Sequence, residues 1–104
     1  MGIRTLNLLT AAGADAVGAT IAKPAEARVT TYQAIETGTG AITGTVVIEG
    51  TNDGTHFVPL ATISLDDTTT ATQGFTSNER WVFTRARVTA ISGTGAAITV
   101  IMGY

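Results

Sequence analysis

The chain of 104 residues has no cysteine, a single histidine and only 13% charged residues. Without cysteine, neither disulfides nor a thiolate metal site can stabilise the fold, so packing and strand pairing have to do so. Ordinary soluble domains contain about 25% charged residues, so much of this surface must consist of other residue types. A charge-poor surface rich in threonine fits two kinds of protein. One is a monomer kept soluble by hydroxyl groups, and the other is a subunit largely covered by its neighbours.

The remaining absences limit the partners that we expect. Net charge is −2 and Lys23 is the only lysine, so we expect no groove that follows a phosphate backbone and no nucleic-acid partner. No apolar run approaches the ~20 residues of a membrane helix, which argues against a membrane partner. The N-terminal residues lack the pattern of a signal peptide, so we expect a protein made without export. The length predicts one domain.

A near-repeat organises the sequence. The four residues Ala27-Arg28-Val29-Thr30 reappear as Ala86-Arg87-Val88-Thr89, and each copy leads to Gly-Thr-Gly and then to Ile-Thr. The two Gly-Thr-Gly segments, at 38–40 and 93–95, predict turns of two similar β-hairpins. They do not predict phosphate-binding loops, because the third glycine and helix of a dinucleotide site and the Gly-Lys-Ser/Thr of a P-loop are missing.

The hydrophobic pattern predicts an all-β fold. About eight short strands are separated by turn residues, at 3–9, 17–22, 28–35, 42–49, 57–65, 70–75, 80–91 and 97–102. This spacing is typical of a single antiparallel β-sandwich, jelly-roll-like, over residues 1–104. Residues 1–10 are expected either within it or as an extended arm or strand exchanged with a neighbouring copy. The alanines between 8 and 23 favour at most a helical turn or two.

No pattern of catalytic residues is present. His56 lacks a cysteine nucleophile, and the serines at 64, 77 and 92 do not lie in a Gly-x-Ser-x-Gly motif. Asp66-Asp67 offers oxygen ligands for Ca²⁺, but aspartate is common in turns for backbone reasons and no EF-hand spacing exists. We therefore expect a protein that is not an enzyme, with no catalytic residues, cofactor or metal.

Two segments carry a resemblance to a known class of proteins. They are Val47-Ile48-Glu49-Gly50-Thr51-Asn52-Asp53-Gly54-Thr55-His56-Phe57-Val58-Pro59-Leu60 and Trp81-Val82-Phe83-Thr84-Arg85-Ala86-Arg87-Val88-Thr89-Ala90-Ile91-Ser92-Gly93-Thr94-Gly95. Their turn and their aromatic-rich strand resemble those of small β-sandwich virion proteins of tailed bacteriophages. The first segment also resembles a hairpin of some carbohydrate-binding sandwiches.

The phage resemblance implies a non-enzymatic structural protein of a virion assembled in the bacterial cytoplasm. A capsid decoration (cement) protein is the first expectation, and a tail, neck or baseplate subunit is the alternative. The implied partners are the chain itself, as a homotrimer, and the major capsid protein or other virion subunits. A carbohydrate-binding module is a second alternative, with a sugar stacked on Trp81, Tyr32 or Tyr104 and bonded by Asn52 or Asp53.

Two groups of residues are candidates for the interface between subunits. The first is the apolar N-terminal strand, and the second is an aromatic and cationic face on the strand at 80–91, where Trp81 and Phe83 alternate with buried positions. Alternatively, Trp81 and Phe83 cover one end of the core and take no part in an interface. The candidate residues are Ile3, Leu6, Leu8, Leu9, Trp81, Phe83 and Arg85.

Overall fold

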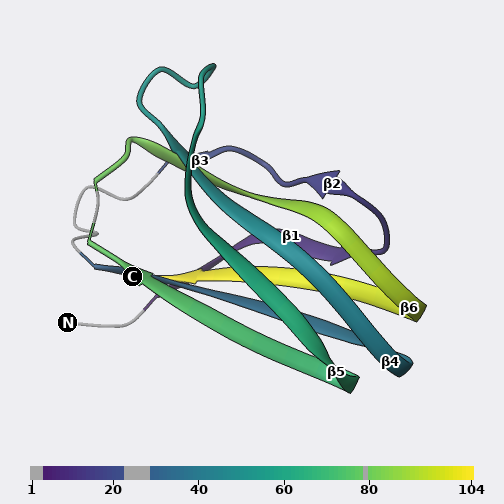
Figure 1. Cartoon of the computed structure of the whole chain (residues 1–104). Coiled ribbons are helices and arrows are strands. Elements are labelled where there is room, and N and C mark those ends of the chain that lie inside the picture. Colours follow the sequence, from purple (N-terminus) through teal and green to yellow (C-terminus); the bar gives the residue numbers. More distant parts are fainter. Residues whose placement is uncertain (1–3, 23–28, 79) are drawn as a thin grey trace.

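The computed structural model describes residues 4–22, 29–78 and 80–104, and regular structure in these ranges consists of β-strands (Figure 1). Three strands are short: β1 (Thr5–Ala12), β2 (Ala16–Val17) and β3 (Ile21–Ala22). Three are long: β4 (Thr30–Thr51), β5 (Val58–Ser77) and β6 (Phe83–Gly103). The expected all-β antiparallel class is confirmed. The described residues form six strands, three of them long, so the expected set of about eight short strands is not confirmed.

All six strands belong to one antiparallel sheet, with β4 at its centre. β5 pairs with one side of β4 and β6 pairs with the other. β1 pairs with the C-terminal half of β6, whereas β2 and β3 pair with its N-terminal half. β5 therefore forms one edge of the sheet, and the short strands form the other. No helix long and apolar enough to span a membrane occurs in the ranges that the structure describes.

Each long strand bends near its middle, and the three bends lie side by side at one end of the molecule (Figure 1). Positive φ angles mark them, at Gly40 (93°) in β4, Thr69 (68°) in β5, and Gly93 (123°) and Gly95 (65°) in β6. Glycine adopts such angles without steric cost, which explains its place at the bends of β4 and β6. Thr39 also pairs with Thr94, so these two bends are joined by the ladder.

The Gly-Thr-Gly segments are therefore not hairpin turns, and that expectation is wrong. The two halves of β4 do not pair with each other; each half continues the same ladders with β5 and β6. The near-repeat instead encodes a strand, a bend and a second strand. Ile42 and Ile98, which follow the two bends, are both completely buried.

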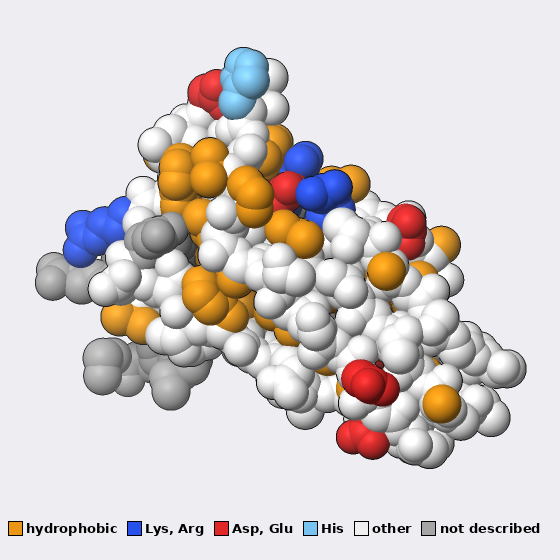
Figure 2. Space-filling model, in the orientation of Figure 1, with side chains coloured by type: hydrophobic (Ala, Val, Ile, Leu, Met, Phe, Trp, Pro, Cys, Tyr) orange, Lys and Arg blue, Asp and Glu red, His pale blue; other side chains and the backbone are white. Residues whose placement is uncertain are grey.

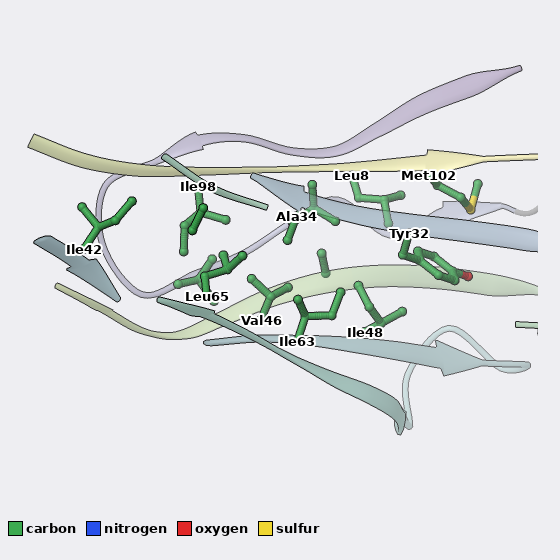
Figure 3. Packing of buried hydrophobic residues seen from close by; sticks show 14 residues of the cluster. Leu8, Tyr32, Ala34, Ile42, Val46, Ile48, Ile63, Leu65, Ile98 and Met102 are labelled. Carbon is green, nitrogen blue, oxygen red and sulfur yellow. The ribbon is translucent and has the colours of Figure 1, made fainter. Parts of the chain in front are cut away.

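The bends bring side chains from both halves of the sheet into one core (Figure 3). Along β4 and β6 the even-numbered residues point inward on both sides of the bend. The Tyr32 hydroxyl joins the two halves by a hydrogen bond of 3.3 Å with the Thr84 hydroxyl. The buried hydrophobic residues are Leu8, Tyr32, Ala34, Ile42, Val46, Ile48, Ile63, Leu65, Ala71, Ala86, Val88, Ile98, Val100 and Met102.

One carboxyl group lies inside this core. Glu36 on β4 is completely buried, and neither of its carboxyl oxygens has a hydrogen-bond partner among the described residues. It faces Gly44 in the other half of β4, where an added Cβ would lie 2.7 Å from Oε1 of Glu36. Gly44 thus leaves the space that the carboxyl group occupies. Burial raises the pKa of Glu36 above its ordinary value, because the charged form loses its hydration.

Candidate interaction surface

An acidic residue and two arginines meet on the outer side of the sheet, close to the turn between β4 and β5. Odd-numbered residues of β4 and β6 point outward here, and Glu49 lies directly opposite Arg85 in the ladder. Arg87 is two residues further along β6 and therefore lies on the same side. Phe57, at the end of the turn, completes the group. We call the surface formed by Glu49, Phe57, Arg85 and Arg87 the arginine face.

The contacts within the arginine face are short and specific. Arg85 Nε donates to Glu49 Oε1 at 2.8 Å, and an Arg87 Nη2 hydrogen donates to Glu49 Oε2 at 3.1 Å. The Arg85 guanidinium also lies over the Phe57 ring, 3.5 Å from its centre. These neighbours leave the Glu49 side chain only 6% exposed, whereas those of Arg85 and Arg87 are 23% and 40% exposed.

This geometry gives a fixed surface with an excess of positive charge. Glu49 uses both oxygens in charge-assisted hydrogen bonds, which hold the two guanidinium groups in place. A cation over an aromatic ring adds about 0.5–1 kcal/mol at a partly exposed site. One carboxylate between two guanidiniums leaves a net charge of +1. The arginine face is thus suited to contact a surface that offers apolar atoms and a hydrogen-bond acceptor or carboxylate.

The turn beside this face is also held by side chains. Oδ1 of Asp53 accepts hydrogen bonds from the backbone N–H groups of Thr55 and His56, both at 2.8 Å, and from the Thr51 hydroxyl at 2.9 Å. Its Oδ2 lies 2.8 Å from His56 Nδ1. These bonds stabilise the carboxylate and lower the pKa of Asp53 well below its ordinary value. The expected tight turn is therefore present, with Gly54 at positive φ.

Two exposed valines lie near the ends of the turn: Val58 begins β5 and pairs with Gly50, on the side of the sheet opposite Glu49, and Val82 directly precedes β6. Figure 2 shows the histidine at the tip of the turn and hydrophobic side chains gathered below it. Val58 and Val82 are 44% and 49% exposed, which is high for large apolar residues. The side chain of Asn52 fixes this region by accepting a hydrogen bond from the Val82 N–H at 3.1 Å. This bond ties the turn to the residue that precedes β6.

The candidates on β6 are brought together only in part. Arg85 belongs to the arginine face, and Phe83 is half-buried beside Gly54 of the turn. Trp81 precedes β6 and packs against the backbone of Gly50, where an added Cβ would lie 2.5 Å from its indole ring. The tryptophan therefore helps to cover the end of the sheet, which is the second role that the sequence left open for Trp81 and Phe83.

The N-terminal candidates lie in the chain's own sheet. Leu8 is 2% exposed and belongs to the core, and Leu6 and Leu9 pack against it. Ile3 lies outside the described residues. In the single chain, β1 pairs with β6; an exchange of this strand between copies would preserve the same contacts and remains a prediction.

Sequence reasoning missed Glu49, Phe57 and Arg87 as members of the surface. The alternation of residues 42–49 places Glu49 on the outer side, but only the ladder shows that Arg85 lies opposite it. The sequence did offer one signal for this ion-pair cluster: Arg85 and Arg87 lie two residues apart on one strand, and Glu49 lies on the outer side of another.

The other chemical candidates do not assemble into a reactive site. The His56 side chain is 87% exposed, and its Nδ1 contacts Oδ2 of Asp53. The described residues contain no group of three histidine, aspartate or glutamate side chains close enough to hold a metal ion. Asp66 and Asp67 lie inside β5 and pair with Thr43 and Ile42, so the expected turn at these residues is not present. Asp67 Oδ1 accepts a hydrogen bond from the Thr68 N–H at 2.7 Å, just before the bend at Thr69.

Of the residues suggested for sugar binding, Asn52 and Asp53 are exposed, Trp81 and Tyr104 are partly exposed, and Tyr32 is buried. The Tyr32 ring is 1% exposed and stacks on Phe75 inside the sheet, so it offers no face to a sugar. A shallow groove of about 530 Å³ nevertheless lies over the paired stretches of β4 and β5, and its lining includes Thr31, Gln33 and Thr72.

Comparison with known protein families, with curated proteins and with solved structures finds no match to this chain. The role of the surface therefore has to be inferred from its own geometry.

Proposed function

We propose that this protein is a non-enzymatic structural subunit of a tailed-phage particle, and that its role is that of a capsid decoration (cement) protein. Its partners are then further copies of itself, as a homotrimer, and the major capsid protein. It acts by adding contacts between subunits that hold the head together, and it resides in the virion. A subunit of the tail, neck or baseplate is the alternative place within the same particle.

The observation that carries this proposal is the arginine face. Glu49 fixes Arg85 and Arg87 before any partner arrives, so little side-chain freedom remains to be lost on binding. Arginine and aromatic residues are enriched at protein interfaces, and this face combines two arginines with the Phe57 ring. The rest of the chain is poor in charge, which suits lateral contacts with neighbouring subunits.

We also propose that the bent sheet acts as a β-sandwich of the jelly-roll-like kind expected for such subunits. Support comes from the core residues in Figure 3, which lie between the two halves of the long strands. A fold of this kind presents the arginine face to neighbours on an outer side of the sheet, close to the β4–β5 turn.

Immunogold electron microscopy tests the place in the particle. An antibody raised against the purified protein is applied to tailed-phage particles from the organism that encodes it. Regular gold label on heads is the expected result, and label confined to tails moves the protein to the alternative location. Particles that carry no label, although the protein is produced alongside them, would contradict a virion role.

The arginine face is tested by Arg85→Ala, with Arg80→Ala as the matched control at an exposed arginine just before β6. We expect Arg85→Ala to reduce gold label on particles, while Arg80→Ala leaves it near the wild-type level. Circular dichroism of both variants verifies that they remain folded. Equal labelling by both variants would remove the arginine face from the contact.

The groove over β4 and β5 favours one second candidate, a carbohydrate-binding module. Hydroxyl and amide side chains line it, and such groups bond sugar hydroxyls. A glycan array probed with the wild-type protein and with Gln33→Ala tests this function. Binding that the substitution abolishes would support it, and the absence of signal on the array would eliminate it.

A further inference from the structure

The edge strand β5 differs between its two halves in the features that usually protect a sheet edge. β4 is its only strand neighbour in the part of the chain that the structure describes. An open edge presents backbone N–H and C=O groups to any further strand, and proteins commonly block it with lysine, proline, a bulge or a very short strand. The half of β5 before the bend carries Pro59 near one end and Asp66 and Asp67 at the other.

The half of β5 after the bend carries no such protection. Residues 70–76, which we call the edge segment, read Thr-Ala-Thr-Gln-Gly-Phe-Thr and contain neither a charged residue nor proline. Their ladder with β4 runs from Thr37↔Thr70 to Thr31↔Thr76 without a register shift, so the segment is regular along its whole length. It is therefore a suitable template for one more antiparallel strand.

The opposite edge of the same half of the sheet is irregular. β1 forms that edge, and its ladder with β6 has register shifts between Asn7 and Leu9 and between Leu9 and Ala12. Ala11 also has a positive φ of 49°. Irregularities of this kind are among the devices that stop an edge from accepting a strand. A ring or filament joins the β5 edge of one copy to the β1 edge of the next, so it needs both edges to be regular. A two-fold pair joins the same edge of both copies, so one regular edge is enough.

We propose that the edge segment pairs antiparallel with the edge segment of a second copy of this chain, about a two-fold axis at Gln73, so that the two sheets become continuous. In this arrangement a charge at or next to the axis would lie close to the same charge of the second copy, and the absence of charge from residues 70–76 avoids that repulsion.

The register centred on Gln73 also matches the side chains. Residues directly opposite each other share one side of a sheet, so Thr70 meets Thr76 of the second copy and Ala71 meets its Phe75. Phe75 is half-buried in the single chain, and the small Ala71 opposite leaves room for its ring. Threonine pairs on the outer side add cross-strand hydrogen bonds. This contact does not use the arginine face and does not depend on the proposed function.

The absence of cysteine gives a direct test of the two-fold contact. In Gln73→Cys the two introduced thiols lie opposite each other, with Cβ atoms about 4.5–5.5 Å apart, close to what a disulfide requires. Thr62→Cys is the matched control, because Thr62 is an exposed residue on the other half of the same strand. Each variant is oxidised mildly at micromolar concentration and run on a denaturing gel without reductant.

We expect Gln73→Cys to form a covalent dimer at least about tenfold faster than Thr62→Cys, because pairing raises the local thiol concentration toward millimolar. Equal, slow cross-linking of both variants would overturn the proposal. A second variant, Gln73→Lys, places two ammonium groups opposite each other and should shift the mass measured by sedimentation toward the single chain. An unchanged mass distribution for Gln73→Lys would also overturn it, whereas particle labelling tests the proposed function alone.

Discussion

Two buried glutamates on β4 show how differently one strand can treat the same side chain. Glu36, before the bend, points into the core and has no hydrogen-bond partner among the described residues. Glu49, after the bend, points outward and is covered by Arg85, Arg87 and Phe57. Both residues are at most 5% exposed, so burial alone does not distinguish them. The difference lies in the neighbouring strand, which offers Ile98 beside Glu36 and Arg85 beside Glu49.

This comparison separates two consequences of burying a carboxyl group. Burial without a partner favours the neutral form, so Glu36 costs stability when it has to ionise. Burial beneath two guanidiniums satisfies the carboxylate, and removal of its charge leaves two arginines without their acceptor. We therefore expect the same substitution to have opposite effects at the two positions.

The largest effect is expected from Glu49→Gln. The amide keeps the shape of the side chain but removes the charge that holds Arg85 and Arg87, so we expect the free energy of unfolding at neutral pH to fall by about 1–3 kcal/mol. Urea unfolding measures the change. The identical substitution Glu36→Gln is the matched control and should not lower stability. Equal losses for both variants would show that the comparison is wrong.

Glu36→Met tests whether the carboxyl group without a partner lowers the stability of the core. Methionine has nearly the length of glutamate and no polar atom that needs a hydrogen bond, so we expect the free energy of unfolding to rise by about 1–2 kcal/mol. Urea unfolding again provides the measurement, with Glu49→Met as the control that should destabilise. A clear loss of stability in Glu36→Met would mean that the carboxyl group makes a favourable interaction in the core.

The pH dependence of stability should reflect Glu36. Its folded-state pKa is raised above the ordinary value of 4.5, so the folded chain holds this proton more tightly than the unfolded chain. The resulting stabilisation is complete below pH 4.5 and is lost as pH rises through the raised pKa. Relative to Glu36→Gln, the wild type should therefore gain stability on acidification from neutral pH. Thermal unfolding of both proteins at several pH values measures the difference.

Asp53 has the opposite effect on the pH dependence of stability, so the wild type has to be compared with Glu36→Gln. Its folded-state pKa is lowered, so its stabilisation is present at neutral pH and is lost as the solution becomes strongly acidic. Both proteins contain Asp53, so its effect cancels in their difference. Parallel pH profiles for the two proteins would contradict a neutral Glu36 in the core.

The smallest effect is expected from Arg85→Lys. Lysine keeps the charge but loses the planar contact with Phe57 and the geometry of the bond to Glu49, which should lower stability by about 0.5–1 kcal/mol. Arg87→Lys is the control, since the ring contact belongs to Arg85. A larger loss for Arg87→Lys than for Arg85→Lys, in urea unfolding, would place the main contact on the other arginine.

The sequence predicted the strand class but not the path of the strands. The alternation of residues 42–48 correctly placed Ile42, Gly44, Val46 and Ile48 on the buried face. The Gly-Thr-Gly segments were misinterpreted because a positive φ angle permits both a reversal and a bend. Which of the two occurs is decided by the partners of the flanking strands, and those partners are distant in sequence.

The same limit explains what was found and missed at the surface. Arg85 was identified because it is a cation among aromatics within one strand. Glu49 and Phe57 were missed because their contacts with Arg85 depend on the register between β4 and β6 and on the position of the turn. The alternation of a strand shows which side chains lie on its outer face, but the residue opposite each of them is known only from the register between the strands.

The most direct test of the central claim, that charge-poor surfaces join copies of this chain, is its mass in solution by light scattering over a range of concentrations. The account predicts species heavier than the 10.6 kDa chain, increasing with concentration and reduced by Gln73→Lys. A constant mass of 10.6 kDa at every concentration would contradict the claim.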